Sequence, residues 1–250
     1  MKPQSADRVT RRVISEGEAV QQLENGSRMD QRTFHALYVR TPEGFKAELI
    51  GGIVYVMTSP VSARHGFPHA RLIYWLTTYS AATEWTEVGD NTTSILGESS
   101  EPQADAFLVI DPACGGATRI DRKGYVIGPP EFVAEVANSS ASIDLGAKKK
   151  DYETAGVREY VVIQVREKAV SWFTRTAAGV FAELSPDALG VFSSSVFPGL
   201  QLSARSFFAR RPALLGEELR AGLASPEHAA FVADLAARRQ AKPKKPRKSK

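Results

Sequence analysis

The sequence predicts an α/β fold, a mixed β-sheet flanked by helices, from three observations. Short apolar runs bounded by turn residues alternate with segments of helical periodicity. A strand, a helix and a second strand follow one another over residues 131–165, an order that favours parallel pairing of the two strands. The helix of that unit stops at Gly156, as expected of a residue that adopts the left-handed conformation of helix ends. A chain of 250 residues is long enough for one domain with a substantial core.

Local signals place the elements in chain order. An N-terminal extension is expected to contain a helix around Val13–Leu23, and Asp30 is placed to cap a short helix. Residues 47–57 predict a strand pair that turns at Gly51-Gly52. The remaining expected elements are a helix at 68–82, strands at 86–95, 104–110 and 131–136, a helix at 143–155, strands at 159–165 and 169–174, and a last helix opened by Ser225-Pro226-Glu227.

These elements suggest an extension over residues 1–27, a folded domain over 28–208, a helical segment over 209–240 and a basic tail over 241–250. The formal net charge is +4, and the tail contributes six positive charges, so the remainder carries −2. A Pro-rich, Lys-rich tail cannot form a core, and it is expected either to attract phosphate backbones or simply to keep the protein soluble.

Several classes of protein are disfavoured by composition. No apolar run approaches the roughly 20 residues that span a bilayer, and the N-terminus lacks the apolar core of a signal peptide. Cys114 is the single cysteine, which excludes an internal disulfide framework and fits a cytoplasmic protein. A zinc cluster or a Gly-rich nucleotide loop is not indicated either.

Two carboxylates lie in or beside predicted buried strands. Asp105 precedes the apolar run 106–110, and Glu135 lies inside Phe-Val-Ala-Glu-Val-Ala. Burying such a charge is costly unless it is paired or binds a cation. Neighbouring strands would hold the two carboxylates rigidly, and hard oxygen ligands suit Mg²⁺, for which Mn²⁺ can substitute. Lys148 follows on the next predicted helix, where an ammonium could orient a water and offset charge on a phosphate.

Four segments around these residues occur in a recognisable order. They are Glu48-Leu-Ile-Gly-Gly, Gln103-Ala-Asp105, Glu135-Val-Ala-Asn-Ser139, and a helix with Asp144, Gly146, Lys148, Tyr152 and Ala155-Gly156 that leads into Glu159-Tyr160. Over about residues 28–208 the chain resembles the Uma family of restriction endonucleases, within the PD-(D/E)XK nuclease superfamily. That family shows the corresponding patterns ELIDGE, QPD, EV-x-S and D-x-G-x-K-x-x-x-Y-x-x-A-G. The chain departs from it at Ala104 and at Gly51-Gly52, where one proline and two acids are replaced.

The resemblance implies a restriction-endonuclease-like fold and a Mg²⁺-dependent endonuclease that hydrolyses phosphodiester bonds of DNA. Nucleases of this fold often act as homodimers. Asp105, Glu135 and Lys148 would be the catalytic residues, because the usual lysine position two residues after Glu135 is Ala137. The expected metal ligands are Asp105, Glu135, the carbonyl of Val136 and Glu48. The expected supporting residues are His65, Gln103 and Asp144.

Other interpretations stay open from the residues themselves. Lys148 could simply pair with Asp144 one helical turn away, and Lys150 would replace it if the helix register differed. The altered segment after Glu48 and the basic tail would also suit a nucleic-acid-binding or regulatory protein that keeps the fold without catalysis. The mildly acidic body would suit a phosphodiesterase acting on a small nucleotide. Two carboxylates could serve a glycosidase, but a lysine on the following helix favours a metal nuclease.

Overall fold

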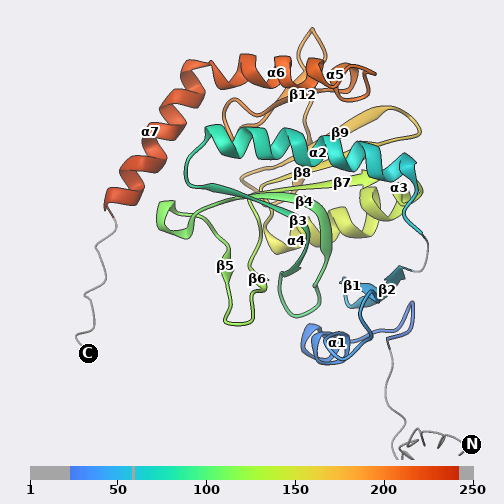
Figure 1. Ribbon diagram of the computed structural model, residues 1–250. Coiled ribbons are helices and arrows are strands. Elements are labelled where there is room, and N and C mark those ends of the chain that lie inside the picture. The colour runs from blue at the N-terminus through green and yellow to red at the C-terminus, as the bar shows by residue number, and fades with distance from the viewer. Residues whose placement is uncertain (1–22, 58–59, 242–250) are drawn as a thin grey trace, which may run out of the picture.

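The computed structural model describes residues 23–57 and 60–241, and within them a mixed eight-stranded sheet organises the chain (Figure 1). The strand order is β10-β9-β8-β7-β4-β3-β6-β5. β7 pairs in parallel with β8 and β3 with β6, and the other pairs are antiparallel. The strands are β3 (Thr86–Ile95), β4 (Gln103–Ile110), β5 (Arg119–Ile120), β6 (Val126–Ile127), β7 (Phe132–Ala137), β8 (Glu159–Gln164), β9 (Ala169–Arg175) and β10 (Phe181–Glu183). The predicted α/β fold with a mixed sheet is confirmed.

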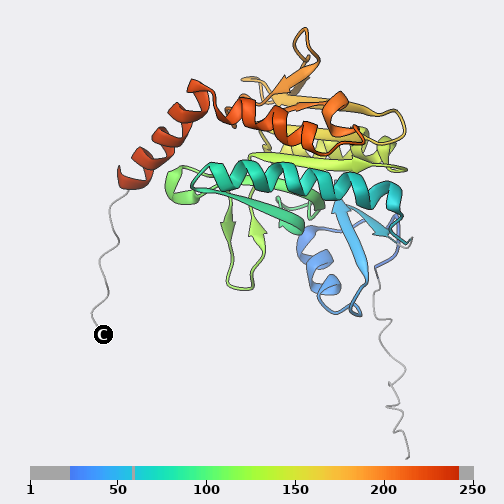
Figure 2. The ribbon, with the colours of Figure 1, turned by 45° about the horizontal axis from the view of Figure 1, so that its top comes forward.

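One face of the sheet is covered by α2 (Ala63–Ala82) and α6 (Ala213–Leu223), which contact each other and lie side by side in both ribbon views (Figures 1 and 2). Trp75 of α2 packs against Phe132 and Trp172 of the sheet in the largest buried apolar cluster. Burying an aromatic side chain of this size stabilises the fold by about 1.5–3 kcal/mol. This packing anchors α2, whose first turn reaches the edge of the candidate site.

The other face is covered by the crossover between the parallel strands β7 and β8. The crossover consists of a short α3 (Ala141–Ile143), a π-helical turn η2 (Asp144–Lys148) and α4 (Lys149–Ala155), which ends at Gly156 with φ +98°. Tyr152 and Tyr160 pack against each other in the apolar cluster beneath it. The expected β-α-β unit is therefore present, but one of its helical turns is wider than an α-helical turn.

A small hairpin forms a separate two-stranded sheet beside the main one (Figure 1). β1 (Lys46–Ile50) and β2 (Ile53–Met57) turn at Gly51-Gly52, where both φ values are positive (+56° and +77°), a conformation that glycine adopts without steric cost. Residues on one side of the hairpin pack against α1 (Gln31–Tyr38), whose first turn is capped by the Asp30 carboxylate. The strand pair and the capped helix are both as predicted.

Differences from prediction occur mostly at element ends and in the C-terminal part. α2 begins at Ala63 rather than at residue 68, so Pro68 lies inside the helix and the added turn carries His65. The prediction also lacked a 3-10 turn, five short strands and two helices: η1 (Pro112–Cys114), β5, β6, β10, β11 (Val191–Ser193), β12 (Gln201–Ser203), α5 (Ala204–Phe207) and α6. The last helix, α7 (Pro226–Ala241), begins after Ser225 as expected. The helix expected near residue 13 and the basic tail from residue 242 lie outside the described residues.

Candidate active site

Asp105 and Glu135 are brought together by the register of β4 and β7. Ala106 pairs with Ala134 in this antiparallel ladder, so Asp105 and Glu135 lie opposite each other one step further along. Directly opposed residues have Cβ atoms about 4.5–5.5 Å apart and point to the same face. The Asp105 amide donates to Glu135 Oε2 at 3.4 Å, and the Val136 amide donates to Asp105 Oδ2 at 2.7 Å. The two carboxylates that stood 30 residues apart in the sequence thus form one site.

Glu135 is buried and is held by two donors on the same oxygen. The Lys148 ammonium lies 3.1 Å from Oε1, and the Tyr152 hydroxyl donates to that atom at 2.8 Å. Burial raises the pKa of Glu135 well above its usual value, because the Lys148 charge only partly offsets the loss of water and the nearby carboxylates oppose a further negative charge. The Oε2 atom lacks such strong donors, so it is the oxygen better placed to take a ligand.

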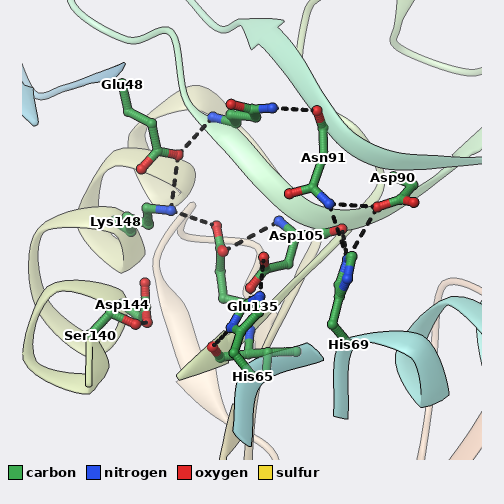
Figure 3. A network of polar contacts seen from close by, with 12 residues as sticks. Glu48, His65, His69, Asp90, Asn91, Asp105, Glu135, Ser140, Asp144 and Lys148 are labelled. Carbon is green, nitrogen blue, oxygen red and sulfur yellow. Dashed lines mark hydrogen bonds and ion pairs between the residues drawn. The ribbon is translucent and has the colours of Figure 1, made fainter. Parts of the chain in front are cut away.

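The lysine that enters the site is the last residue of the π-helical turn. A π-helical turn contains about one more residue than an α-helical turn and often occurs at a functional site. Lys148 ends this turn and lies buried, while Lys149 sits over the Phe173 ring and Lys150 pairs with Glu153 at the surface. Lys148 forms ion pairs with Glu48 and Glu135 rather than with Asp144 (Figure 3). Burial lowers the pKa of Lys148, but the charges of the neighbouring acids outweigh it and raise the pKa above its usual value, so the side chain is an ammonium.

Glu48 enters the site from the β1–β2 hairpin. Its Oε1 lies 3.0 Å from the Lys148 ammonium and accepts from the Gln103 amide at 2.7 Å. The hairpin turn is tied to α4, because the buried Asp151 carboxylate accepts from the Gly51 amide at 3.2 Å and from the Ser100 hydroxyl at 2.5 Å. The Gly51-Gly52 departure from the family pattern therefore leaves Glu48 in contact with the predicted lysine.

His65 lies against Asp105 and the Val136 carbonyl. Its Nε2 is 3.3 Å from Asp105 Oδ1 and its Nδ1 is 3.1 Å from the Val136 oxygen. The contact with Asp105 raises the pKa of His65. Burial raises the pKa of Asp105, but the contact with His65 and the Val136 amide outweighs it, so the pKa lies below its usual value. The His65 ring, whose raised pKa favours the positively charged form, therefore contacts both Asp105 and the Val136 carbonyl, two of the expected metal ligands.

A second polar chain continues from this point along β3 and β4 (Figure 3). His69, one turn after His65, contacts the Asp105 carbonyl at 3.0 Å and the Asp90 carboxylate at 3.1 Å. Asn91 lies between the paired residues Asp90 and Thr92 of the β3–β4 ladder and has φ +46°, an uncommon conformation outside glycine. The Gln103 side chain donates to the Asn91 carbonyl at 2.6 Å. The sequence singled out Gln103 but did not assign a role to Asp90 or Asn91.

Asp144 lies near the site without joining its ion pairs. It is buried and accepts from the Ser140 hydroxyl at 2.5 Å, and burial raises its pKa. The Tyr160 hydroxyl donates to the Asp144 carbonyl at 2.9 Å, at the start of the π-helical turn. Asp144 thus adds negative potential to the site, and its main chain helps to hold the turn that carries Lys148.

These groups surround a cavity of about 400 Å³. Its lining includes Glu48, Asp105, Glu135 and Asp144, four acids whose charge the two lysines of the lining, Lys46 and Lys148, offset only in part. Excess negative charge and hard oxygen donors fit a divalent cation. Throughout the described ranges, no three His, Cys, Asp or Glu side chains are arranged to hold a metal ion together. A cation would therefore rely on two carboxylates and a main-chain carbonyl, and Glu48 is engaged by Lys148 instead.

Tyr152 is a candidate functional residue that was not among the expected site residues. It is buried, and its hydroxyl donates to Glu135. One signal was available, since residues four apart on a helix share a face and Tyr152 follows Lys148 by four. The direction of its hydroxyl could not be read from that spacing.

Comparisons with known proteins give the same family as the motifs. A family model described as "Putative restriction endonuclease" (Uma2) matches residues 32–205. A crystal structure described as that of "a putative nuclease belonging to DUF820" from Anabaena variabilis ATCC 29413 superposes with a TM-score of 0.55. It shares 15% sequence identity and covers 72% of this chain and 97% of its own, and so supports a nuclease-like fold. No curated protein matches. None of the helices in the described residues has the length and apolar character needed to cross a membrane. With most of its length matched by the model, the chain belongs to the Uma2 family, which supports a nuclease.

Proposed function

We propose that this protein is a metal-dependent endonuclease that hydrolyses phosphodiester bonds of DNA. The observation that carries the proposal is the Lys148 ammonium, which lies between Glu48 and Glu135 beside Asp105 in one cavity. A buried cation shared by acids would also be found in a purely structural ion pair. The cavity and the family description favour a reaction with phosphate.

Asp105 and Glu135 would hold Mg²⁺ or Mn²⁺, with the Val136 carbonyl as a further ligand. When bound, the ion would polarise the scissile phosphate and stabilise the leaving oxygen. Lys148 donates a hydrogen bond to the attacking water and offsets charge developing on the phosphate. The water oxygen bonds to phosphorus while the bond to the leaving oxygen breaks. One proton passes from the water to solvent and another reaches the leaving oxygen, giving a phosphomonoester and a hydroxyl end.

Glu48 and His65 orient the reacting groups rather than the substrate. Glu48 fixes the ammonium from the hairpin side, at 3.0 Å, and so keeps Lys148 from folding onto Glu135 alone. His65 holds the Asp105 carboxylate at 3.3 Å, a contact that a cation bound by Asp105 would replace.

A homodimer would place two such sites on the two strands of a duplex. Light scattering of the purified protein measures its oligomeric state.

Cleavage of supercoiled plasmid with Mg²⁺ or Mn²⁺ tests the proposal, using wild type, Glu135→Ala, Lys148→Ala and Lys150→Ala. Lys150 is the matched control because it neighbours Lys148 but pairs at the surface. We expect metal-dependent nicking by wild type and by Lys150→Ala, and its loss in the other two variants.

Cleavage that persists in both site variants would mean that the site is wrongly placed. A wild type that binds DNA but cleaves neither plasmid nor single strands would instead support a binding or regulatory protein that keeps the fold. Cleavage confined to small nucleotides would support the phosphodiesterase alternative.

A further inference from the structure

The two sides of the β1–β2 hairpin are chemically different. Ala47, Leu49 and Val54 point to the side packed on α1. The opposite side carries Lys46 and Glu48 on β1 and their cross-strand partners Met57 and Tyr55 on β2. Side chains alternate between faces along a strand, so these four share one face. All four line the cavity of the candidate active site, which makes this face of the hairpin one wall of the cavity.

Only Glu48 on this wall is engaged by the catalytic groups. Lys46 is exposed and forms no ion pair, and Tyr55 is half-buried without a hydrogen bond or an aromatic partner, as judged from the described residues. The other lysine of the cavity, Lys148, is already shared by two acids. Lys46 is thus the lysine of the lining that is available to an anionic ligand.

The spacing along β1 relates Lys46 to the reacting centre. Residues two apart on a strand lie roughly 7 Å from each other. Lys46 therefore stands one such step from Glu48, which contacts Lys148. A neighbouring phosphate of the same strand lies about one nucleotide step from the scissile phosphate and would meet the Lys46 ammonium.

The cavity also limits the form of the substrate. Its volume of about 400 Å³ falls at the low end of the range of roughly 300–1,000 Å³ usual for small-ligand pockets. It has room for a nucleotide or two rather than for the width of a duplex. A tyrosine ring can stack only on a base that has left its own stack. Gln103 also lines the cavity, and its side-chain oxygen Oε1 is buried without a hydrogen-bond partner in the described part of the chain. This oxygen would accept a hydrogen bond from a base or a sugar.

We propose that the wall formed by Lys46 and Tyr55 binds the strand next to the scissile phosphate, and that this strand is single-stranded or locally unpaired there. Lys46 contacts the adjacent phosphate and Tyr55 stacks on a base. This inference rests on the proposed nuclease function, because it takes the substrate to be a nucleic-acid strand.

Binding of a fluorescein-labelled single-stranded oligonucleotide, followed by anisotropy in EDTA, tests the wall separately from cleavage. In Lys46→Ala we expect the slope of log K against log salt to fall by about 0.7, the value for one phosphate contact on a single strand. Tyr55→Leu should weaken binding roughly tenfold with an unchanged slope. Lys150→Ala is the control of equal charge change away from the cavity and should keep the wild-type slope. Thermal melts establish that each variant is folded.

Wild-type affinity and slope in both wall variants would overturn the inference, and so would a Tyr55→Leu effect of equal size on a fully paired duplex. If the Lys46 and Tyr55 variants bind the strand unchanged and still cleave plasmid, the nuclease function is supported and the role of the wall is refuted. Strand binding that depends on Lys46 and Tyr55 in a protein without cleavage would support the wall and refute the nuclease.

Discussion

Replacing Tyr152 by Phe removes one atom that contacts Glu135 and keeps the ring in the core. The Tyr152 hydroxyl donates to Glu135 Oε1 at 2.8 Å, and the same oxygen is paired with Lys148 at 3.1 Å. Both residues are buried, so no water is available at the surface to replace the hydroxyl. The variant leaves Glu135 with a single strong donor on that oxygen.

The expected cost follows from these contacts. A hydrogen bond to a charged group contributes about 1.5–3 kcal/mol, and because Lys148 stays in place we expect the lower end, about 1.5 kcal/mol of unfolding free energy. For a chain of this size that corresponds to roughly 3–6 °C in Tm. Partners that orient metal ligands typically change metal affinity or activity by about 10- to 100-fold. Tyr152 is outside the cavity lining, so we expect kcat to fall while KM is unchanged.

The assay is metal-dependent plasmid cleavage together with thermal unfolding and Mn²⁺ titration. Tyr79→Phe is the matched control, because the Tyr79 hydroxyl is equally buried but donates to the Pro198 carbonyl at 2.9 Å on the other side of the sheet. It should lose about 1 kcal/mol of stability, as for a neutral hydrogen bond, and cleave like wild type. Equal kcat and metal affinity in the two variants would refute the positioning role and make Tyr152 a packing residue.

Three further predictions concern stability. Burial outweighs two serine donors and raises the pKa of Glu159, so the folded carboxyl binds its proton at higher pH than the unfolded one and wild type loses stability as pH rises through the folded pKa. In urea unfolding, the stability of Glu159→Gln relative to wild type should therefore increase as pH rises from about 4.5, the ordinary pKa of a glutamate. A stability difference that does not change with pH would contradict this. In Gly116→Ala the new Cβ would lie 1.7 Å from the Ile110 carbonyl oxygen, so we expect a loss of at least about 1–3 kcal/mol, whereas Gly66→Ala in open space on α2 should gain up to about 1 kcal/mol. Mg²⁺ at 100 times its Kd should stabilise wild type by about 2.7 kcal/mol and leave Asp105→Asn unchanged in calorimetry, and an equal shift in both would place the ion elsewhere.

Sequence patterns were sufficient where the determining interactions are local. Strands β4, β7, β8 and β9 were predicted within one residue at each end, because apolar runs bounded by turn residues report strand burial directly. Strand β3 was predicted with its observed bounds although most of its residues are polar. The three-residue strands β10, β11 and β12 are too short to show a period. The first turn of α2, before Pro68, was not predicted, and Pro68 lies inside the helix. Family motifs, rather than periodicity, brought Asp105, Glu135, Lys148 and Glu48 into one hypothesis.

What the sequence by itself determined is the set of chemical groups, their order along the chain and the α/β class, since these follow from composition and from the 2-residue and 3.6-residue periods. Only the tertiary structure decided how the groups meet. The β4–β7 register places Asp105 opposite Glu135, the hairpin brings Glu48 to Lys148, and the crossover between β7 and β8 places Lys148 rather than Lys150 among the acids. A strand register, a widened helical turn and a hydroxyl direction such as that of Tyr152 depend on contacts between distant segments, whose energies no local pattern contains.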